Sequence, residues 1–200
     1  MRASTKLPYV LKTKRLGLRH WSPHDVEPFA RMNQDPQVMR YFPSLLTRTQ
    51  TEELIEAIER HFTEHEYGLY AVDQMSSSAF IGFVGLYTAT FEEEFTPCPE
   101  IGWRLDSRYW GQGYATEAAC ACLQQGFGEF GIEEVFSFTS AINRRSIAVM
   151  ERIGLHYRKR FLHPRIDQDS ELCQHVLYAL TRSEYSQMEA EKARNHGHPR

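Results

Sequence analysis

The stretch RYWGQGYATEA, residues 108–118, limits the possible folds of this chain more than any other part of the sequence. It follows EIGWRL (100–105), which we interpret as a strand, and it leads into a run of Ala, Glu and Gln that is typical of a helix. Glycine loses more conformational freedom on folding than any other residue, so two glycines at a helix start indicate that something approaches the backbone closely. The sequence therefore predicts a strand, a glycine turn and a helix, with a ligand at the turn.

Two known phosphate-binding motifs fit this turn poorly. A Walker loop ends in Lys followed by Ser or Thr, and the turn has no such ending. A dinucleotide fingerprint has a third glycine where Thr116 stands, and its strand lies near the start of a chain rather than halfway along it. What remains is a helix N-terminus, whose first amides have no partner within the helix and bind anions together with the helix dipole. A diphosphate is the ligand that such a site favours.

Side chains at the turn support this interpretation. Gly111 and Gly113 remove the Cβ atoms that would hold phosphates away from the backbone. Arg108 adds a cation beside them, and Thr116 adds a hydroxyl. Tyr114 could stack on a cofactor or serve packing. The alternative hypothesis for the whole turn is that its glycines serve packing alone.

Hydrophobic periodicity and turn residues divide the rest of the chain into further elements. Early helices are followed by an antiparallel run of strands and then by strand–helix–strand, which predicts an α+β fold with a central sheet rather than a doubly wound parallel sheet. We expect one domain over residues 1–185 and a polar, frayed tail over 186–200. The expected strands are 15–20, 67–73, 79–89, 100–105, 134–141, 155–163 and 174–181, and the expected helices are 23–34, one from Thr47, one at the glycine turn and 143–154.

Composition argues against several classes of protein. The formal net charge of −3 and the sequence pI of about 6.3 argue against a nucleic-acid partner, because proteins that bind nucleic acids usually carry an excess of basic residues. No stretch approaches the roughly 18–20 apolar residues of a membrane span, so we expect neither a membrane partner nor a membrane location. The four cysteines form no CxxC pair and the nine histidines lack metal spacing, which predicts no metal site and favours a reduced, cytoplasmic protein.

Two motifs in order resemble those of the GNAT N-acetyltransferase superfamily. RYWGQGYA matches the R/Q-x-x-G-x-G/A pyrophosphate loop of that family, and NRRSIAVMERIG (143–154) is similar to the N-x-x-S-x-x-V-x-E-K-x-G segment of its RimJ/RimL-type branch, which acetylates ribosomal-protein N-termini. PEIGWRL and TKRLGLR resemble the fourth and first strands of that branch. The likeness covers roughly residues 10–182, with mild departures at Arg152, where Lys is commoner, and Trp103, where Tyr is commoner.

The resemblance implies a GNAT fold: a central, mostly antiparallel mixed sheet flanked by helices and splayed between its fourth and fifth strands. It implies acetyl-CoA as co-substrate, with the diphosphate on the turn amides and the pantetheine arm running beside the fourth strand like an extra strand. Asn143 would face the far end of the cofactor, a role that can coexist with helix N-capping. The cofactor-binding residues implied in this way are Trp103, Arg104, Leu105, Arg108, Gly111, Gln112, Gly113, Tyr114, Ala115, Thr116 and Asn143.

The chemistry of the family is direct attack of an amine on a thioester, for which the amine loses a proton and the departing thiolate gains one. We expect Glu100 to act as the general base through water, and the alternative is a solvated or structural carboxylate. Ser146 is the expected general acid, and the alternative is an ordinary residue of the first helical turn. A backbone amide of residues 103–105 is the natural donor to the developing oxyanion.

The sequence says less about the acceptor. The resemblance implies a primary amine, either a protein N-terminus or a small amine, and it is compatible with a homodimer. Residues 92–94, all Glu, would attract a cationic amine, although such a run is usually a solvated loop. Trp21, Tyr41 and Phe42 could line the acceptor pocket or lie in the core.

Two other functions stay open at this point. The chain could keep the cofactor slot without turnover, as an acyl-CoA-binding or sensing module. It could also transfer another acyl group, such as succinyl, which requires a larger pocket at the thioester end.

Overall fold

The computed structural model describes residues 8–196, which divide into two compact units. The first unit consists of the chain up to Tyr87 together with Ile101–Gln124, and the second of Thr88–Glu100 together with the chain from Gln125 onward. Strand β5 (Cys98–Leu105) and helix α3 (Tyr114–Gly128) each contribute residues to both units.

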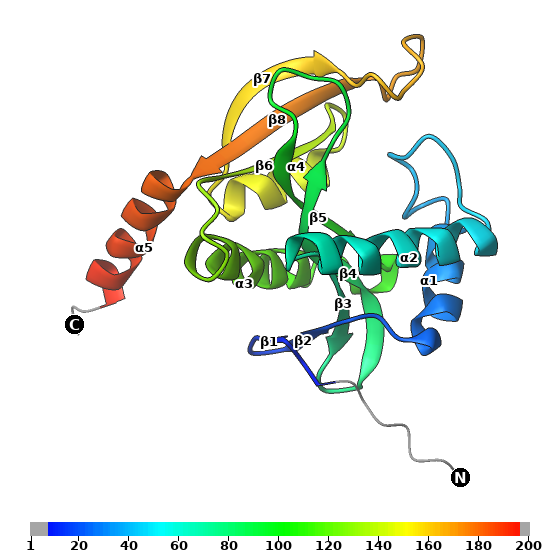
Figure 1. Ribbon diagram of the computed structural model, residues 1–200, viewed down its shortest axis with the longest axis horizontal. Helices are drawn as coiled ribbons and strands as arrows, with labels where there is room; N and C mark the ends of the chain where they lie inside the picture. The colour runs from blue at the N-terminus through cyan, green and yellow to red at the C-terminus, as the bar shows by residue number, and fades with distance from the viewer. Residues whose placement is uncertain (1–7, 197–200) are drawn as a thin grey trace. The chain divides into compact units, whose positions relative to one another are not determined.

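The first unit pairs its strands in the order β1-β2-β3-β4-β5, with antiparallel pairing from β1 to β4 (Figure 1). Leu18 of β2 lies opposite Val72 of β3, and both are buried. The elements of this unit besides β5 and α3 are β1 (Leu11–Lys12), β2 (Leu16–Arg19), η1 (Pro23–Asp25), α1 (Val26–Asn33), α2 (Arg48–His65), β3 (Leu69–Gln74), β4 (Ala79–Ala89, whose last two residues belong to the second unit) and η2 (Ser107–Tyr109).

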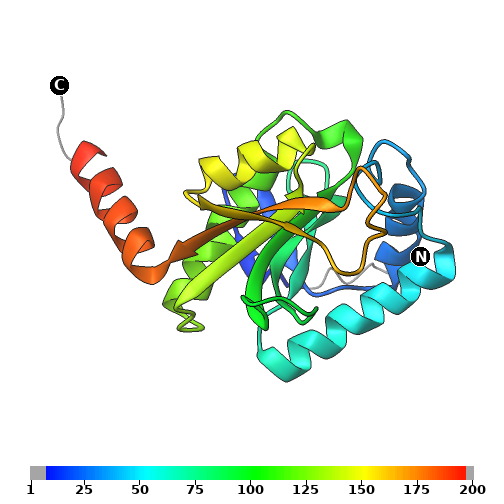
Figure 2. The ribbon, with the colours of Figure 1, turned by 90° about the horizontal axis from the view of Figure 1, so that it is seen from above.

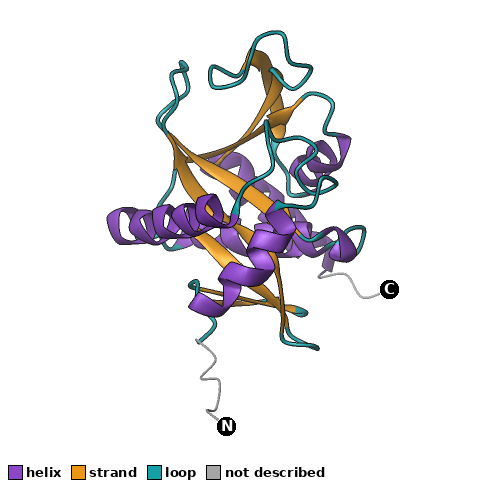
Figure 3. Ribbon diagram, turned by 90° about the vertical axis from the view of Figure 1, so that its right-hand side faces the viewer, coloured by secondary structure: helices purple, strands orange, loops and turns teal. Residues whose placement is uncertain are grey.

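The second unit pairs its strands in the order β5-β6-β8-β7, which makes eight strands in all. β8 is antiparallel to both β6 and β7, whereas β5 and β6 are parallel. Within the part of the chain that the structure describes, Glu100 opposite Phe136 is the single register pair between β5 and β6. These are the fourth and fifth strands of the family, and so short a pairing agrees with the predicted splay between them. The remaining elements are β6 (Glu134–Ser140), α4 (Arg144–Arg152), β7 (His156–Leu162), β8 (Gln174–Thr181) and α5 (Arg182–His196), and Figure 3 shows helices and strands in separate colours.

Helix α2 begins where its sequence dictates. The Thr47 hydroxyl accepts from the Gln50 backbone amide, and the Gln50 side chain accepts from the Thr47 amide, so two donors at the helix start are satisfied reciprocally. Ile55, Ile58 and Phe62 recur at helical spacing and are buried.

Three charges are buried together in the first unit. The Arg19 guanidinium donates to Asp25 at 2.6 and 2.8 Å and to Asp73 at 2.8 and 3.0 Å. Both aspartates are 2% exposed, so without the arginine two buried carboxylates would lack a counter-charge. This triad connects β2, β3 and the start of the first helical segment.

The predicted strands and helices are confirmed with small shifts in their ends, and the predicted sheet is mixed and mostly antiparallel. The main difference is α5, which is helical to His196, whereas the polar sequence predicts a frayed tail from residue 186. The reason is local: Thr181 and Glu184 exchange hydrogen bonds at its start, and Tyr185 stacks on Phe127 with ring centroids 4.7 Å apart. Figure 2 shows α5 leading away from the end of β8. Residues 197–200 lie outside the described residues.

The buried triad generates a stability prediction. Arg19→Met leaves two buried carboxylates without a cation, and we expect the free energy of unfolding to fall by about 3–5 kcal/mol in urea denaturation. Arg31→Met is the matched control because Arg31 pairs with Glu27 on the surface, with both side chains more than half exposed, and we expect less than about 1 kcal/mol there. Equal losses in the two variants would contradict the assignment of the triad as a buried charge cluster.

Candidate active site

The glycine turn before α3 has a backbone conformation that residues other than glycine rarely adopt. Gly111 has a φ of 73° and Gly113 a φ of 79°, both in the left-handed region. A Cβ added at Gly111 would meet no protein atom within 4 Å, so its surroundings are open. Backbone conformation therefore requires the two glycines, and the packing alternative has no support at Gly111.

The turn and the first turn of α3 present a continuous run of unpartnered amides. Glu117 is the first residue of this helix whose amide bonds within the chain, to the Gly113 carbonyl at 3.0 Å. Within the described residues, none of the six amides from Gly111 to Thr116 donates to a protein acceptor. Gly111 and Gly113 are exposed. Such a run, at the positive end of a helix of 15 residues, is a site for a phosphate group.

A hairpin far away in the sequence holds the turn in place. The Glu117 carboxylate accepts from the Thr13 hydroxyl at 2.5 Å, from the Arg15 amide at 2.8 Å and from the Arg15 guanidinium at 2.6 Å. Arg15 also donates to the Gln112 carbonyl at 2.8 Å. Desolvation raises the pKa of Glu117, but these hydrogen bonds outweigh it and lower the pKa below its usual value. Sequence reasoning misses Arg15 and Glu117, because no motif connects residues a hundred positions apart.

Other side chains of the turn are already engaged. Tyr114 is buried, accepts from the Gln74 amide at 2.7 Å and lies under the Arg15 guanidinium, so its environment is that of a packing residue. The Arg108 guanidinium donates three hydrogen bonds to Asp106, at 2.6, 3.0 and 3.1 Å, so it is paired with a carboxylate. The hydrogen bonds from Arg108 lower the pKa of Asp106.

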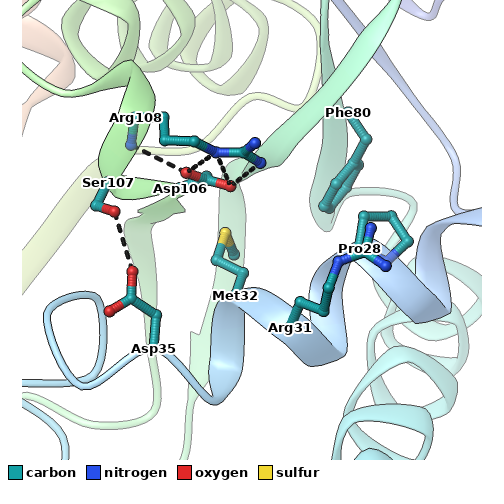
Figure 4. A pocket seen from close by; sticks show the side chains of 8 residues that line it. All are labelled: Pro28, Arg31, Met32, Asp35, Phe80, Asp106, Ser107 and Arg108. Carbon is teal, nitrogen blue, oxygen red and sulfur yellow. Dashed lines mark hydrogen bonds and ion pairs between the residues drawn. The ribbon is translucent and has the colours of Figure 1, made fainter.

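A pocket of about 360 Å³ lies in the first unit beside this loop (Figure 4). Arg31 and Asp35 of the α1 region line it together with Asp106, Ser107 and Arg108. The Ser107 hydroxyl donates to Asp35 at 3.0 Å, as Figure 4 shows. Because two acids and two arginines share the lining, the pocket favours neither sign of charge. Pro28, Met32 and Phe80 complete the lining.

Glu100, the expected base, lies on β5 opposite Phe136 of β6. In a parallel pair, residues in register share a face of the sheet, and this face carries an aromatic cluster in which Phe95 and Phe136 stack at 6.0 Å. Within the described chain the Glu100 carboxylate has no hydrogen-bond partner, and desolvation raises the pKa of Glu100 to about 8. A carboxyl group with this pKa is suited to take protons near neutral pH.

Asn143 and Ser146, at the start of α4, are joined by two hydrogen bonds. The Asn143 side chain accepts from the Ser146 amide at 3.3 Å and donates to the Ser146 hydroxyl oxygen at 3.0 Å. It also donates to the Thr139 hydroxyl at 2.9 Å. Asn143 is therefore the N-cap of α4. Because the Ser146 oxygen accepts from Asn143, its own proton is left to donate elsewhere.

The backbone of residues 103–105 follows the register pair at Glu100. Within the described residues, β5 has no further register partner in β6. The Leu105 carbonyl accepts from the Trp110 indole at 2.7 Å, and Leu105 itself is buried. The Arg104 side chain donates to Asn33 of α1 at 2.7 Å, so it is engaged on the helix side of the strand.

Residues expected near the acceptor have mixed surroundings. Trp21 is 6% exposed and its indole donates to the Leu69 carbonyl at 2.7 Å, so it is a core residue. Phe42 is exposed and lies over Arg104. The Arg40 guanidinium carbon lies 5.6 Å from the ring centroid of Tyr41.

The acidic loop is partly neutralised. Lys159 lies 3.0 Å from Glu94 and 3.8 Å from Glu93, so one lysine contacts two of the three acids and offsets one negative charge. This loop attracts a cationic amine less than the sequence alone suggests.

The described residues meet the requirements of neither a metal site nor a membrane-spanning helix. Among residues 8–196, no three His, Cys, Asp or Glu side chains are grouped as metal ligands would be. In the same part of the chain, no helix combines the length and apolar character needed to cross a membrane.

Comparison with known proteins gives consistent matches. The family model described as "Acetyltransferase (GNAT) domain" matches residues 15–156. YkkB of Bacillus subtilis (strain 168), an uncharacterized protein, is 34% identical over 160 residues, covering 80% of this chain and 90% of YkkB. A crystal structure of a GNAT-family acetyltransferase from Bacillus anthracis superposes with a TM-score of 0.72 at 25% identity, covering 86% of this chain and 98% of that one.

The ribosomal L7/L12 alpha-N-protein acetyltransferase RimL, solved in complex with coenzyme A, superposes with a TM-score of 0.71. It covers 86% of this chain and 97% of its own, but at 15% identity it shows the fold alone. These matches confirm the fold class that the two motifs predicted.

Proposed function

Because the chain belongs to the GNAT family and is an acyl-CoA-dependent N-acetyltransferase, we propose that it transfers the acetyl group of acetyl-CoA to a primary amine by direct attack in a ternary complex. The observation that carries this proposal is the run of six unpartnered amides from Gly111 to Thr116. That run fits a diphosphate, and the RimL and Bacillus anthracis structures share this fold, the former with coenzyme A bound.

The turn amides would hold the diphosphate of acetyl-CoA. The clamp of Arg15 and Glu117 keeps these amides in place before a ligand arrives, so little ordering is left for binding. Arg108 would contribute to this site only if its guanidinium left Asp106 and paired with a phosphate instead. The backbone of residues 103–105 would bind the pantetheine arm, and one of its amides would donate to the carbonyl oxygen as negative charge develops there.

Glu100 would act as the general base. An ammonium has no free electron pair, so Glu100 takes its proton, directly or through one water, and the neutral amine nitrogen then attacks the thioester carbonyl carbon. The new C–N bond forms as the C–S bond breaks, and the nitrogen loses its second proton to solvent. The raised pKa of Glu100 supports this role, because a base with an ordinary carboxyl pKa takes protons weakly near pH 7.

Ser146 would act as the general acid. Its hydroxyl gives a proton to the departing thiolate sulfur and is reprotonated from solvent. The Asn143 amide supports this by donating to the Ser146 oxygen, which orients the hydroxyl proton away from the cap. The protein N-terminus expected from the RimJ/RimL likeness and a small amine both remain as acceptor classes.

A non-catalytic acyl-CoA sensor and a transferase of another acyl group such as succinyl are the alternatives. A sensor would bind acetyl-CoA and release no thiol with any amine. A succinyl transferase would release thiol faster from succinyl-CoA than from acetyl-CoA at equal concentrations.

The turn is tested by Gly111→Ala. A Cβ there occupies open space beside the amides, so it interferes with a ligand rather than with the protein, and we expect acetyl-CoA affinity measured by calorimetry to fall about 10- to 100-fold. Gly131→Ala is the matched control, since Gly131 also has a positive φ, of 67°, but lies beyond the far end of α3. It carries the same backbone strain, about 1–2 kcal/mol, and should bind as wild type does. Unchanged affinity in Gly111→Ala would remove the diphosphate from this turn.

The base is tested by the pH dependence of kcat/KM. Glu100 must be ionised to act, so we expect log kcat/KM to rise with unit slope up to a pH of about 8 and then to level off. Glu100→Gln should remove this limb and lower the plateau by about 10²- to 10⁴-fold, and any limb that remains belongs to the amine. A limb that is unchanged in Glu100→Gln would show that the carboxylate is structural.

Stability provides a second readout of the same group. The pKa of Glu100 is higher in the folded than in the unfolded chain, so its contribution is complete below about pH 4.5 and is lost as the pH rises through about 8. The free energy of unfolding of Glu100→Gln, relative to that of wild type, should therefore be larger at pH 9 than at pH 5. Urea denaturation at the two pH values measures this difference.

The acid is tested by Ser146→Ala. Because its proton is needed only as the sulfur departs, we expect kcat to fall about 100-fold or more while KM for acetyl-CoA changes little. Ser186→Ala is the control, since that exposed hydroxyl donates to a carbonyl of its own helix at 2.8 Å. A raised KM with unchanged kcat would make Ser146 a binding residue only.

A further inference from the structure

Arg104 is a cation without a counter-ion in the first unit. Its Nη1 donates to the Asn33 side-chain oxygen at 2.7 Å, and this is its one hydrogen bond among the described residues. Its Nε is buried and has no hydrogen-bond partner in residues 8–196. No carboxylate lies within ion-pair distance of the guanidinium in the described chain, and burial lowers the pKa of Arg104 to about 10.

Aromatic rings surround this guanidinium. Its carbon lies 4.1 Å from the ring centroid of Phe42, 5.5 Å from that of Phe83 and 6.0 Å from that of Phe29. The ring faces stabilise a cation but leave its charge in place, and they exclude water that would otherwise screen it. The contrast with Arg19 is direct, because that arginine is buried in the same unit with two aspartates.

The neutral partner of Arg104 is held rigidly. Asn33 is fully buried, and its amide nitrogen donates to the Thr51 hydroxyl at 3.1 Å, which in turn donates to the Thr47 carbonyl at 3.0 Å. This relay directs the Asn33 oxygen at Arg104. Aspartate has nearly the same shape as asparagine and would neutralise the arginine, so the amide leaves the positive charge available.

Resting on the proposed function, we propose that Arg104 binds a carboxylate carried by the acceptor, and that the acceptor is an amino acid or a similar small molecule with both an amine and a carboxylate. With Nη1 held by Asn33, the edge formed by Nε and Nη2 is the one that pairs with two carboxylate oxygens. Phe42, the ring nearest to the guanidinium, is exposed, so this side of Arg104 lies close to the protein surface.

The anion belongs to the acceptor rather than to the acyl donor for a chemical reason. Residues 103–105 are the segment proposed to bind the pantetheine arm, which carries no charge. The charges of coenzyme A lie on its phosphates, and the diphosphate is assigned to the turn at Gly111–Thr116. Polyamines and aminoglycosides are polycations, which Arg104 disfavours.

The test compares matched acceptors. Release of thiol from acetyl-CoA is measured with the common α-amino acids and with their carboxamides, which keep the amine and lose the negative charge. We expect the best acid to exceed its own amide in kcat/KM by about tenfold or more in the wild-type protein. In Arg104→Met, which keeps the length of the side chain, this ratio should fall to within about twofold. The thermal shift caused by acetyl-CoA should be retained, because the pantetheine arm is proposed to bind the backbone of residues 103–105 and not the Arg104 side chain.

Asn33→Asp is a second variant that guards against misfolding of Arg104→Met. It gives the arginine an internal carboxylate, so we expect a melting temperature at or above that of wild type together with loss of the preference for acids. An Asn33→Asp variant that keeps the preference would overturn the proposal. So would a wild-type protein that acetylates amines without preferring acids, or an Arg104→Met variant that loses acetyl-CoA affinity, since the anion would then be a phosphate of the donor.

A readout without turnover separates this proposal from the proposed function. N-acetylated amino acids and their amides are added to the protein with coenzyme A, and the melting temperature is recorded. We expect acids, and not amides, to raise it in the wild type, and neither to raise it in Arg104→Met. An absent shift with acetyl-CoA itself would count against the proposed function, whereas equal shifts with acids and amides would count against the Arg104 site.

Discussion

The left-handed conformation at Gly111 and Gly113 is the constraint on which the candidate site depends. Two positive φ angles turn the chain into α3 so that six successive amides have no acceptor among residues 8–196. A buried run of this kind would be costly, whereas an exposed one is a ready anion site. Hydrogen bonds of Arg15 with Glu117 and with the turn hold the turn in place, so the amides are positioned by the protein itself and not by a ligand.

Charge is handled in two opposite ways within the first unit. Arg19 is buried with Asp25 and Asp73, so its charge is cancelled and it contributes to the fold. Arg104 is held by the neutral Asn33 and by aromatic rings, which fix its position and leave its charge unsatisfied. An uncompensated charge costs stability, and a site for a ligand of opposite charge is one reason for a protein to carry it.

The sequence predicts most of the fold because its signals are local. The helix start at Thr47, the apolar run in 79–89 and the glycine turn each lie within a few residues of the element they define, and the structure confirms these elements. Helix α5 escapes prediction because it is polar all round and shows no apolar stripe, and its start is fixed by Thr181 and Glu184. The site is harder to predict. The turn amides follow from local sequence, but the Arg15–Glu117 clamp depends on residues far apart in the chain.

The electrostatics of the described chain bear on the acceptor more than the run of acids at 92–94 does. Lys159 lies beside Glu93 and Glu94 and offsets one of the three negative charges of this loop, which weakens its attraction for a cationic amine. Arg104 lies on β5, beside which the pantetheine arm is proposed to bind, and its charge has no counter-ion among the described residues. An amine that also carries a carboxylate satisfies this charge, whereas a polyamine adds a second positive charge beside it. The proposed role of Arg104 therefore favours a zwitterionic acceptor over a polycationic one.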